Sequence, residues 1–498
     1  MIRRVHEPME APWTRSSIAE SRAGQNRRSL AVASLVAALV LGGGGSPAPL
    51  AGLALQLVTA VIMLVWLCLG TPPRIATPVR VLAAIAIVLP ALQLVPLPPW
   101  IWQSLPGRES LAGSLALVGA QENWWPISVA PMRTLAVLLA LGPPLAVLLM
   151  TAALPPADRT ILLAAIATAG FAGVLLGAVQ LAQGTGTGAR LYPSGNTGWL
   201  TGLQASRNAA ADMLLIAMVA LAAFASTARQ TRRHARRDQH RSDDSSSGNE
   251  ARTAYRVLAP LVVLAIVFGM FVPAVLMTGS RAGIVLLVPA LFLVAVLTVP
   301  DLAMRRHAVR NAVILATGGA GAAFLAFRLP SLQMVAARFD FATEFRLQLW
   351  SDAAYAAQQA WPVGFGMGTF MPVAIAYEPL ETVDLSVPNR AHNDYLELLV
   401  EAGGSGIAVL LASGAIVAFL LWRAWRNRLV PQAHVLFTSG VLVILAAHSL
   451  VDYPLRSSTL LCVFACAIGM LAPAPISGTA RQAAPDMSMR GDLKVGST

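Results

Sequence analysis

Long apolar runs alternate with short polar segments along most of this sequence. A helix needs about 20 mostly apolar residues to cross a lipid bilayer, and twelve runs reach or approach that length. We therefore expect an all-α polytopic membrane protein with about 12 transmembrane helices. The predicted spans are 30–46, 50–69, 79–97, 132–153, 160–182, 208–226, 257–277, 282–299, 311–327, 403–422, 433–451 and 457–472.

These runs divide the chain into three parts. Residues 30–472 form the predicted membrane domain, flanked by polar tails at 1–29 and 473–498. The polar and basic character of residues 1–29 indicates no cleavable signal peptide. The longest interval between spans, about 328–402, is predicted to be a large extracytoplasmic loop subdomain, because loops of this length usually carry function.

Basic residues are distributed unevenly between the two predicted sides. With both termini in the cytoplasm, 26 of the 36 basic residues fall on the inner side and 10 on the outer side. Cytoplasmic loops of membrane proteins carry the excess of arginine and lysine. We therefore expect a multi-pass membrane protein with both termini in the cytoplasm, in which the basic stretch from Arg229 to Arg256 is a disordered cytoplasmic loop.

Composition agrees with a membrane environment. Charged residues make up 12% of the chain, about half the usual share of a soluble domain. The net charge of +12 is accounted for by the inner loops, so we expect membrane lipids and no nucleic acid as partners. Cys68, Cys462 and Cys466 lie in apolar runs without metal-like spacing, and we expect neither a cofactor nor a metal ion.

The outer arginines are the first candidate site. Arg207 and Arg281 lie at span ends, and Arg346 and Arg390 lie in the large loop. The planar guanidinium fits phosphate oxygens and keeps its charge at any biological pH. Together these side chains predict a site for an anion, with a diphosphate at a lipid surface as the natural candidate. Pairing with lipid headgroups or with nearby acids remains an alternative for each.

Two histidine segments form the second candidate site. His392 and Asn393 occur in the sequence from Arg390 to Glu397, next to the span that begins near 403. Histidine can accept a proton near neutral pH, although ordinary hydrogen bonding explains a loop histidine equally well. His448 and Asp452 are four residues apart, so we expect them on one helix face, as a structural pair or as substrate contacts.

Several short motifs together carry a resemblance to a known family. They are Ser206-Arg207-Asn208-Ala209, Ser280-Arg281-Ala282-Gly283, Arg346 to Trp350 followed by Pro362 to Gly368, His392-Asn393-Asp394-Tyr395 and His448 to Pro454. Over residues 160–472 the chain resembles the O-antigen ligase/polymerase superfamily. The resemblance implies a metal-independent, inverting glycosyltransferase of the C-type fold, working on the periplasmic face on an undecaprenyl-diphosphate-linked glycan donor.

The resemblance also implies roles for individual residues. Arg281 and Arg346 would bind the donor diphosphate and stabilise the leaving group, and His392 would act as the base on the acceptor hydroxyl. The substrate-binding candidates are Arg207, Asn393, Arg390, His448 and Asp452. At Arg207 the chain departs from the family pattern, because Leu203 to Ser206 replace the asparagine-rich approach that is typical of the family.

Alternative functions remain open at this point. Within the family, a ligase moves a finished glycan onto lipid A-core or another acceptor, whereas a polymerase extends a lipid-linked chain. The Trp-rich outer segment 98–131 favours the polymerase only slightly. A transporter of an anionic lipid or glycan is a further alternative, and it predicts charges near the middle of the membrane. A non-catalytic scaffold would leave the outer arginines and His392 unexplained.

Overall fold

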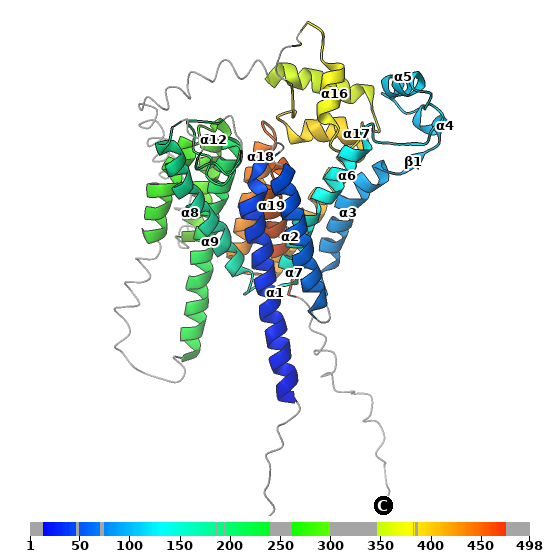
Figure 1. Ribbon diagram of the computed structural model, residues 1–498. Coiled ribbons are helices and arrows are strands. Elements are labelled where there is room, and N and C mark those ends of the chain that lie inside the picture. The colour runs from blue at the N-terminus through cyan, green and yellow to red at the C-terminus, as the bar shows by residue number, and fades with distance from the viewer. Residues whose placement is uncertain are drawn as a thin grey trace, which may run out of the picture.

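The computed structural model describes residues 13–45, 49–69, 74–184, 188–192, 196–239, 261–298, 346–381, 383 and 387–474. These residues are mostly helical (Figure 1). In the described part of the chain, seven helices are long and apolar enough to cross a membrane, and four shorter apolar helices accompany them. A mostly helical membrane protein is thereby confirmed, whereas the number of twelve spans stays a prediction.

The first half of the chain contributes a series of apolar helices and one small excursion. The elements are α1 (Trp13–Leu41), η1 (Gly42–Gly44), α2 (Pro49–Cys68), α3 (Thr77–Gln93), β1 (Pro96–Leu97), α4 (Pro99–Trp102), α5 (Glu109–Leu117), β2 (Trp125–Pro126), α6 (Pro131–Ala140), α7 (Gly142–Ala153), α8 (Thr160–Ala182) and α9 (Arg207–Gln239). The strands β1 and β2 pair antiparallel over two residues each, a small exception to the predicted all-α fold.

The second half completes the bundle and adds residues 346–402, which we call the outer segment after the side on which the sequence predicts it. Its elements are η3 (Val267–Phe271), a π-helical turn, then α11 (Val272–Met277), α12 (Arg281–Thr298), α16 (Phe370–Tyr377), α17 (Asp394–Asn427), α18 (Gln432–His448), η4 (Pro454–Arg456) and α19 (Ser458–Met470). Residues 261–266 and 346–359 are also helical. In Figure 1 the segment around α16 lies at one end of the bundle, beside α4 and α5.

Helix α9 forms the centre of the bundle. It packs against α8, α12 and α18. Of the residues in its most apolar stretch, 83% are buried, compared with 17% for α2 and for α17. Small residues permit this close approach: a Cβ on Gly170 of α8 would lie 2.2 Å from Cβ of Ala217. Helices α2 and α17 instead expose apolar side chains, as expected for helices that face lipid.

A break in α17 joins the outer segment to the bundle. Gly403 has φ 52° and ψ −136° inside the helix, a conformation that only glycine adopts readily. The break frees the carbonyl oxygens of Val400 and Glu401, which accept hydrogen bonds from the backbone N–H groups of Phe365 (3.0 Å) and Gly366 (2.8 Å). The glycine-rich turn 364–368 therefore seals the broken helix, and residues 346–402 are held at the outer end.

The structure revises two boundaries. Helix α1 begins at Trp13, within the predicted tail 1–29, and α9 continues to Gln239, into the predicted disordered loop. The extension of α9 is rich in Ala, Arg and Gln, which favour helix without an apolar face. The predicted span 132–153 agrees with one candidate membrane span, Pro131–Ala153, in which only Leu141 separates α6 from α7. The predicted span 311–327, the start of the loop subdomain and most of the tail 473–498 lie outside the described residues.

Candidate functional site

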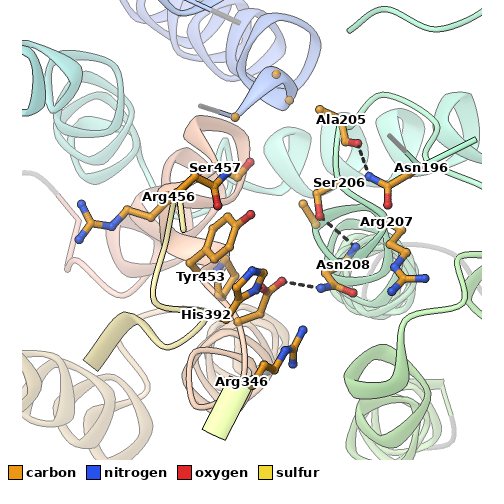
Figure 2. Close-up of a pocket in the computed structure, with 17 residues that line it drawn as sticks. Asn196, Ala205, Ser206, Arg207, Asn208, Arg346, His392, Tyr453, Arg456 and Ser457 are labelled. Carbon is orange, nitrogen blue, oxygen red and sulfur yellow. Dashed lines mark hydrogen bonds and ion pairs between the residues drawn. The ribbon is translucent and has the colours of Figure 1, made fainter. Parts of the chain in front are cut away.

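A cavity of about 330 Å³ opens at the end of the bundle where α1 ends and α9 and α19 begin (Figure 2). It is assembled from segments that are far apart in the sequence. Its lining consists of Gly43, Gly44, Gly45, Asn196, Ala205, Ser206, Arg207, Asn208, Ala209, Arg346, Asn389, His392, Asp452, Tyr453, Pro454, Arg456 and Ser457. Four of the predicted site residues, Arg207, Arg346, His392 and Asp452, are thus brought to one place.

His392 and Asp452 form a hydrogen-bonded pair in the wall of this cavity. The distance between Nδ1 of His392 and Oδ1 of Asp452 is 2.8 Å, and the side chain of His392 is 27% exposed. His392 has φ 50°, in the left-handed region, where residues other than glycine are uncommon and which is often used at functional sites. An ionised Asp452 accepts the Nδ1–H, which leaves Nε2 as a proton acceptor.

Asp452 is satisfied on both oxygens. Its Oδ2 accepts a hydrogen bond from Nδ2 of Asn208, in the first turn of α9, at 2.7 Å. Burial by itself would raise the pKa of Asp452, but the hydrogen bonds from His392 and Asn208 and the nearby positive charge lower the pKa below its ordinary value. Asp452 is therefore ionised at neutral pH, as the orientation of His392 requires.

Two arginines face the cavity from different elements. Arg207 begins α9 and lies over the ring of Trp199, with 5.6 Å between its Cζ and the ring centroid. Arg346 begins the helical segment 346–359 and donates from Nη1 to the carbonyl of Val451 at 2.7 Å. That bond fixes one side of the Arg346 guanidinium against the loop that carries Asp452. Figure 2 shows both arginines on the same cavity as His392.

Arg281 lies at the same end of the bundle, at the start of α12. It is not among the described residues that line the cavity, but its charge interacts with that of Arg346. The turn before it is tight: Gly279 has φ 63°, and a Cβ there would lie 2.3 Å from the ring of Trp199. The ring of Trp199 thereby lies next to both Gly279 and Arg207.

The other two arginines near the site are turned toward carboxylates. Arg456 lines the cavity, but its Nη2 lies 2.7 Å from Glu401 and 3.1 Å from Glu397, and Figure 2 shows the guanidinium pointing away from the other labelled side chains. Burial alone would lower its pKa, yet these carboxylates raise the pKa above the ordinary arginine value. Arg390, predicted to bind substrate, pairs with Glu397 at 2.7 Å and, among the described residues, is not part of the lining.

The expected side-chain pair of His448 and Asp452 is replaced by two other pairs. His448 ends α18, and its Nδ1 lies 2.6 Å from Oδ1 of Asp212 on α9. The His448 side chain is 1% exposed, so it is buried behind the cavity. Asp452 lies beyond the end of α18 and turns to His392 instead. Because α18 stops at His448, the four-residue spacing no longer places the two side chains on one helix face.

Asn393 has a structural position in the described residues. Its Oδ1 accepts from the backbone N–H groups of Tyr395 and Leu396, both at 3.0 Å, and so caps α17. This is the usual role of asparagine at a helix start. Its Nδ2 donates to the carbonyl of Leu450 at 3.1 Å. Asn393 therefore fixes the backbone next to His392 and, like His448, lies outside the described lining.

Sequence reasoning missed several lining residues. Asn208 occurs in a quoted motif but was not singled out as a partner of Asp452. Tyr453 stacks near His392, with ring centroids 5.0 Å apart, and burial next to Asp452 raises its pKa to about 12. The turn Gly43–Gly45 lies at the end of the predicted span 30–46 and was not considered as part of a site. The sequence did contain a signal for this turn: the run Gly42 to Gly45 ends a predicted span on the side that carries the candidate arginines.

The described residues include no group of three or more His, Cys, Asp or Glu side chains that could hold a metal ion. The cavity presents the cations Arg207 and Arg346 with one histidine–carboxylate pair beside them. Such an arrangement can bind a phosphate-containing group, stabilise the charge of a departing oxygen and accept one proton.

Comparison with known proteins bears on the same region. Residues 262–411 match the family described as O-antigen ligase, an interval that contains Arg281, Arg346, Arg390 and His392. A search of curated proteins gave no match. The match confirms the resemblance seen in the sequence motifs and supports a multi-pass membrane protein of the glycan ligase or polymerase type. Residues 262–411 of this membrane protein are therefore similar to the O-antigen ligase family.

Proposed function

We propose that this protein is a bacterial inner-membrane glycosyltransferase that transfers or polymerises an undecaprenyl-diphosphate-linked oligosaccharide on the periplasmic face. The observation that carries the proposal is the cavity at the bundle end, where Arg207 and Arg346 share one space with the His392–Asp452 pair. Cations for a diphosphate and a proton acceptor for a hydroxyl are the groups that such a transfer needs.

The proposed reaction forms one bond and breaks another. The acceptor hydroxyl oxygen attacks the anomeric carbon of the donor sugar, and the bond from that carbon to the diphosphate oxygen breaks. The hydroxyl proton passes to Nε2 of His392, while Asp452 accepts the Nδ1–H and stabilises the imidazolium that forms. The diphosphate leaves with the bonding electron pair, and its charge is met by Arg207, Arg346 and Arg281. Attack opposite the leaving group inverts the anomeric centre.

The proposed orientation is supported by both the sequence and the fold. The intervals predicted to be outside, such as 98–133, 183–207 and 452–456, connect helices at the end that holds the cavity. The basic residues are concentrated in the intervals predicted to be inside, as expected for the cytoplasmic side. A lipid-linked donor would then reach the cavity from the outer leaflet.

The test uses purified protein in liposomes with an undecaprenyl-diphosphate-linked oligosaccharide as donor. Arg281→Ala and His392→Ala are expected to abolish formation of the glycan product while leaving membrane insertion intact. Losing one charge that stabilises a leaving group, or a general base, costs on the order of 10²–10⁴ in rate. Arg133→Ala is the matched control, because Arg133 is an exposed arginine at the same end that does not line the cavity.

The same liposomes distinguish the proposal from a transporter. A transferase converts the donor into a covalently longer or relocated glycan, whereas a transporter moves the donor across the bilayer unchanged. Full transfer by either purified variant would refute the assigned roles. Movement of intact donor without any new glycosidic bond would refute the transferase.

Ligase and polymerase are separated by the glycans of a deletion strain. Loss of the size ladder, with single repeat units still on the acceptor, identifies a polymerase. Accumulation of long lipid-linked chains beside a bare lipid A-core identifies a ligase. Both enzymes use the same donor chemistry, so the arrangement around His392 fits either.

A further inference from the structure

Glu397 is a buried carboxylate behind the cavity that accepts two hydrogen bonds and forms an ion pair with Arg456. Its side chain is 0% exposed. Oε1 accepts from Nη1 of Arg390 at 2.7 Å and lies 3.1 Å from Nη2 of Arg456. Oε2 accepts from the backbone N–H of Ala391 at 3.3 Å. A carboxylate this deep in the protein is costly unless its oxygens are satisfied, and here both are.

The donors come from the two segments that carry the His392–Asp452 pair. Arg390 and Ala391 immediately precede His392, whereas Arg456 follows Asp452 by four residues. One side chain on α17 therefore holds both segments at once. The 2.8 Å contact between His392 and Asp452 spans the same two segments on the cavity side.

The backbone at His392 needs such support. With φ 50°, the backbone of His392 is in an unfavourable conformation that persists only when surrounding contacts hold it. The preceding residue, Ala391, is held through its N–H by Glu397 and through its carbonyl by Nε1 of Trp350 at 2.9 Å. Without Glu397, one of these two restraints and the link to Arg456 are lost together.

We propose that Glu397 is a positioning residue that sets His392 against Asp452 by tying their two chain segments together from behind. The role of His392 as the base rests on the proposed function, whereas the tie itself rests on the contacts alone. Catalytic groups must be held to within about 0.5 Å of their productive geometry, and buried supporting residues supply that restraint. Glu397 is not among the described residues that line the cavity, so it acts through His392.

Glu397→Gln is the informative substitution. Glutamine keeps the size of the side chain but presents one NH₂ group in place of a carboxylate oxygen. Because both oxygens of Glu397 accept hydrogen bonds, the NH₂ group must face a donor on one side, and one tie is broken. Glu401→Gln is the matched control. Glu401 lies one turn further along α17, is also 0% exposed and also binds Arg456, at 2.7 Å. Its side chain forms hydrogen bonds with Arg456 and with the backbone N–H of Phe370 rather than with residues 390–391.

The first readout is the kinetics of glycan transfer by the full-length protein in liposomes. Glu397→Gln is expected to lower kcat about 10- to 100-fold, as a misplaced catalytic group does, with the donor KM nearly unchanged. Glu401→Gln is expected to keep kcat near the wild-type value. Equal losses in both variants would show that the effect runs through Arg456 or general stability, and would overturn the proposal.

The second readout does not depend on activity. In protein labelled with ¹⁵N-histidine, the imidazole N–H of His392 that is bound to Asp452 is identified by its loss in His392→Gln. Its resonance is expected to shift or broaden in Glu397→Gln and to persist in Glu401→Gln. An unchanged resonance in Glu397→Gln overturns the proposal, even if the protein transfers no glycan at all.

Arg390→Gln serves if Glu397→Gln does not fold. Arg390 is 20% exposed, so its replacement disturbs the interior less while removing one of the same ties. The proposal expects the same changes in kcat and in the His392 resonance, smaller in size. A rise in donor KM with an unchanged resonance would instead mean that Arg390 contacts the donor, and would overturn the proposal.

Discussion

Asp452 shows how a single buried carboxylate is kept ionised beside a histidine. Its side chain is 7% exposed, and its two oxygens are taken by His392 and Asn208. The lowered pKa means that the ionised form of Asp452 is more stable in the folded protein than in the unfolded chain. This contribution is fully present above the unfolded pKa of about 4 and is lost as the pH falls through the lower folded value.

Asp452→Asn is therefore expected to destabilise the protein in a pH-dependent way. At pH 7 the loss should be about 1–3 kcal/mol, the usual cost of leaving buried hydrogen-bond partners unsatisfied, and it appears as a lower thermal unfolding midpoint in detergent. The difference from wild type should shrink as the pH is lowered below about 4.

Asp352→Asn provides the comparison for this prediction. Burial raises the pKa of Asp352, which means that its ionised form is not favoured by folding. Its replacement should cost little at pH 7, with no convergence toward wild type in acid. A constant difference between Asp452→Asn and wild type from pH 7 to pH 3 would contradict the ionisation assigned to Asp452.

At the same scale, the sequence indicated the residue types of the site but not their partners. Charge and hydropathy indicated arginines at span ends and His392 shortly before a span. The bond from His392 to Asp452 joins residues 60 positions apart, and Asn208 reaches Asp452 across 244 positions. Such partners depend on which helices are neighbours, and one sequence does not determine that.

Helix α17 is the element on which the outer segment depends. Its break at Gly403 separates a short part that carries Glu397 and Glu401 from the apolar part that continues to Asn427. A Cβ on Gly403 would lie 2.3 Å from the carbonyl oxygen of Pro362. Both the positive φ and the contact with the turn therefore require glycine.

Gly403→Ala is expected to destabilise the protein by at least about 1–3 kcal/mol, the usual cost of forcing such a backbone conformation. Gly414→Ala is the control on the same helix, since nothing lies within 4 Å of its added Cβ, and alanine favours helix over glycine by about 1 kcal/mol. Thermal unfolding of the two purified variants measures the difference. Equal midpoints would show that the break is not required.

Element boundaries reveal where sequence reasoning succeeds. The apolar spans were predictable because lipid requires about 20 apolar residues whatever the neighbours are. The break in α17 was not, because the helix tolerates it only where Phe365 and Gly366 supply backbone donors from another segment. The end of α18 at His448 likewise depends on packing, and the prediction of a shared helix face for His448 and Asp452 was wrong for that reason.

In the whole molecule, the polar residues of the cavity lie at one end of the bundle, and two arginines bind helix C-termini at the opposite end. Arg159 is 0% exposed and donates to backbone carbonyls of the α7 and α19 ends, including Ala152 at 3.1 Å and Met470 at 3.0 Å. Arg229 binds the carbonyls of Leu297 and Thr298 at the end of α12. Cations near helix C-termini are stabilising, so these two arginines fasten the end of the bundle opposite the cavity.

Labelling of single cysteines tests which compartment each end faces. In a variant without native cysteines, Leu380→Cys is expected to react with a membrane-impermeant maleimide added from the periplasmic side, because Leu380 is 89% exposed and belongs to the outer segment. Asn427→Cys, at the exposed opposite end of α17, should react after the inner membrane is opened. The reverse pattern would place the cavity in the cytosol and remove the basis of the proposed function.

The cavity has walls from nearly the full length of the polypeptide, from Gly43 after α1 to Ser457 before α19. A nascent chain that is still leaving the ribosome therefore lacks part of the enclosure until its last helices have entered the membrane. We therefore expect a chain truncated before Asp452 to lack part of the cavity wall, including the hydrogen-bond partner of His392.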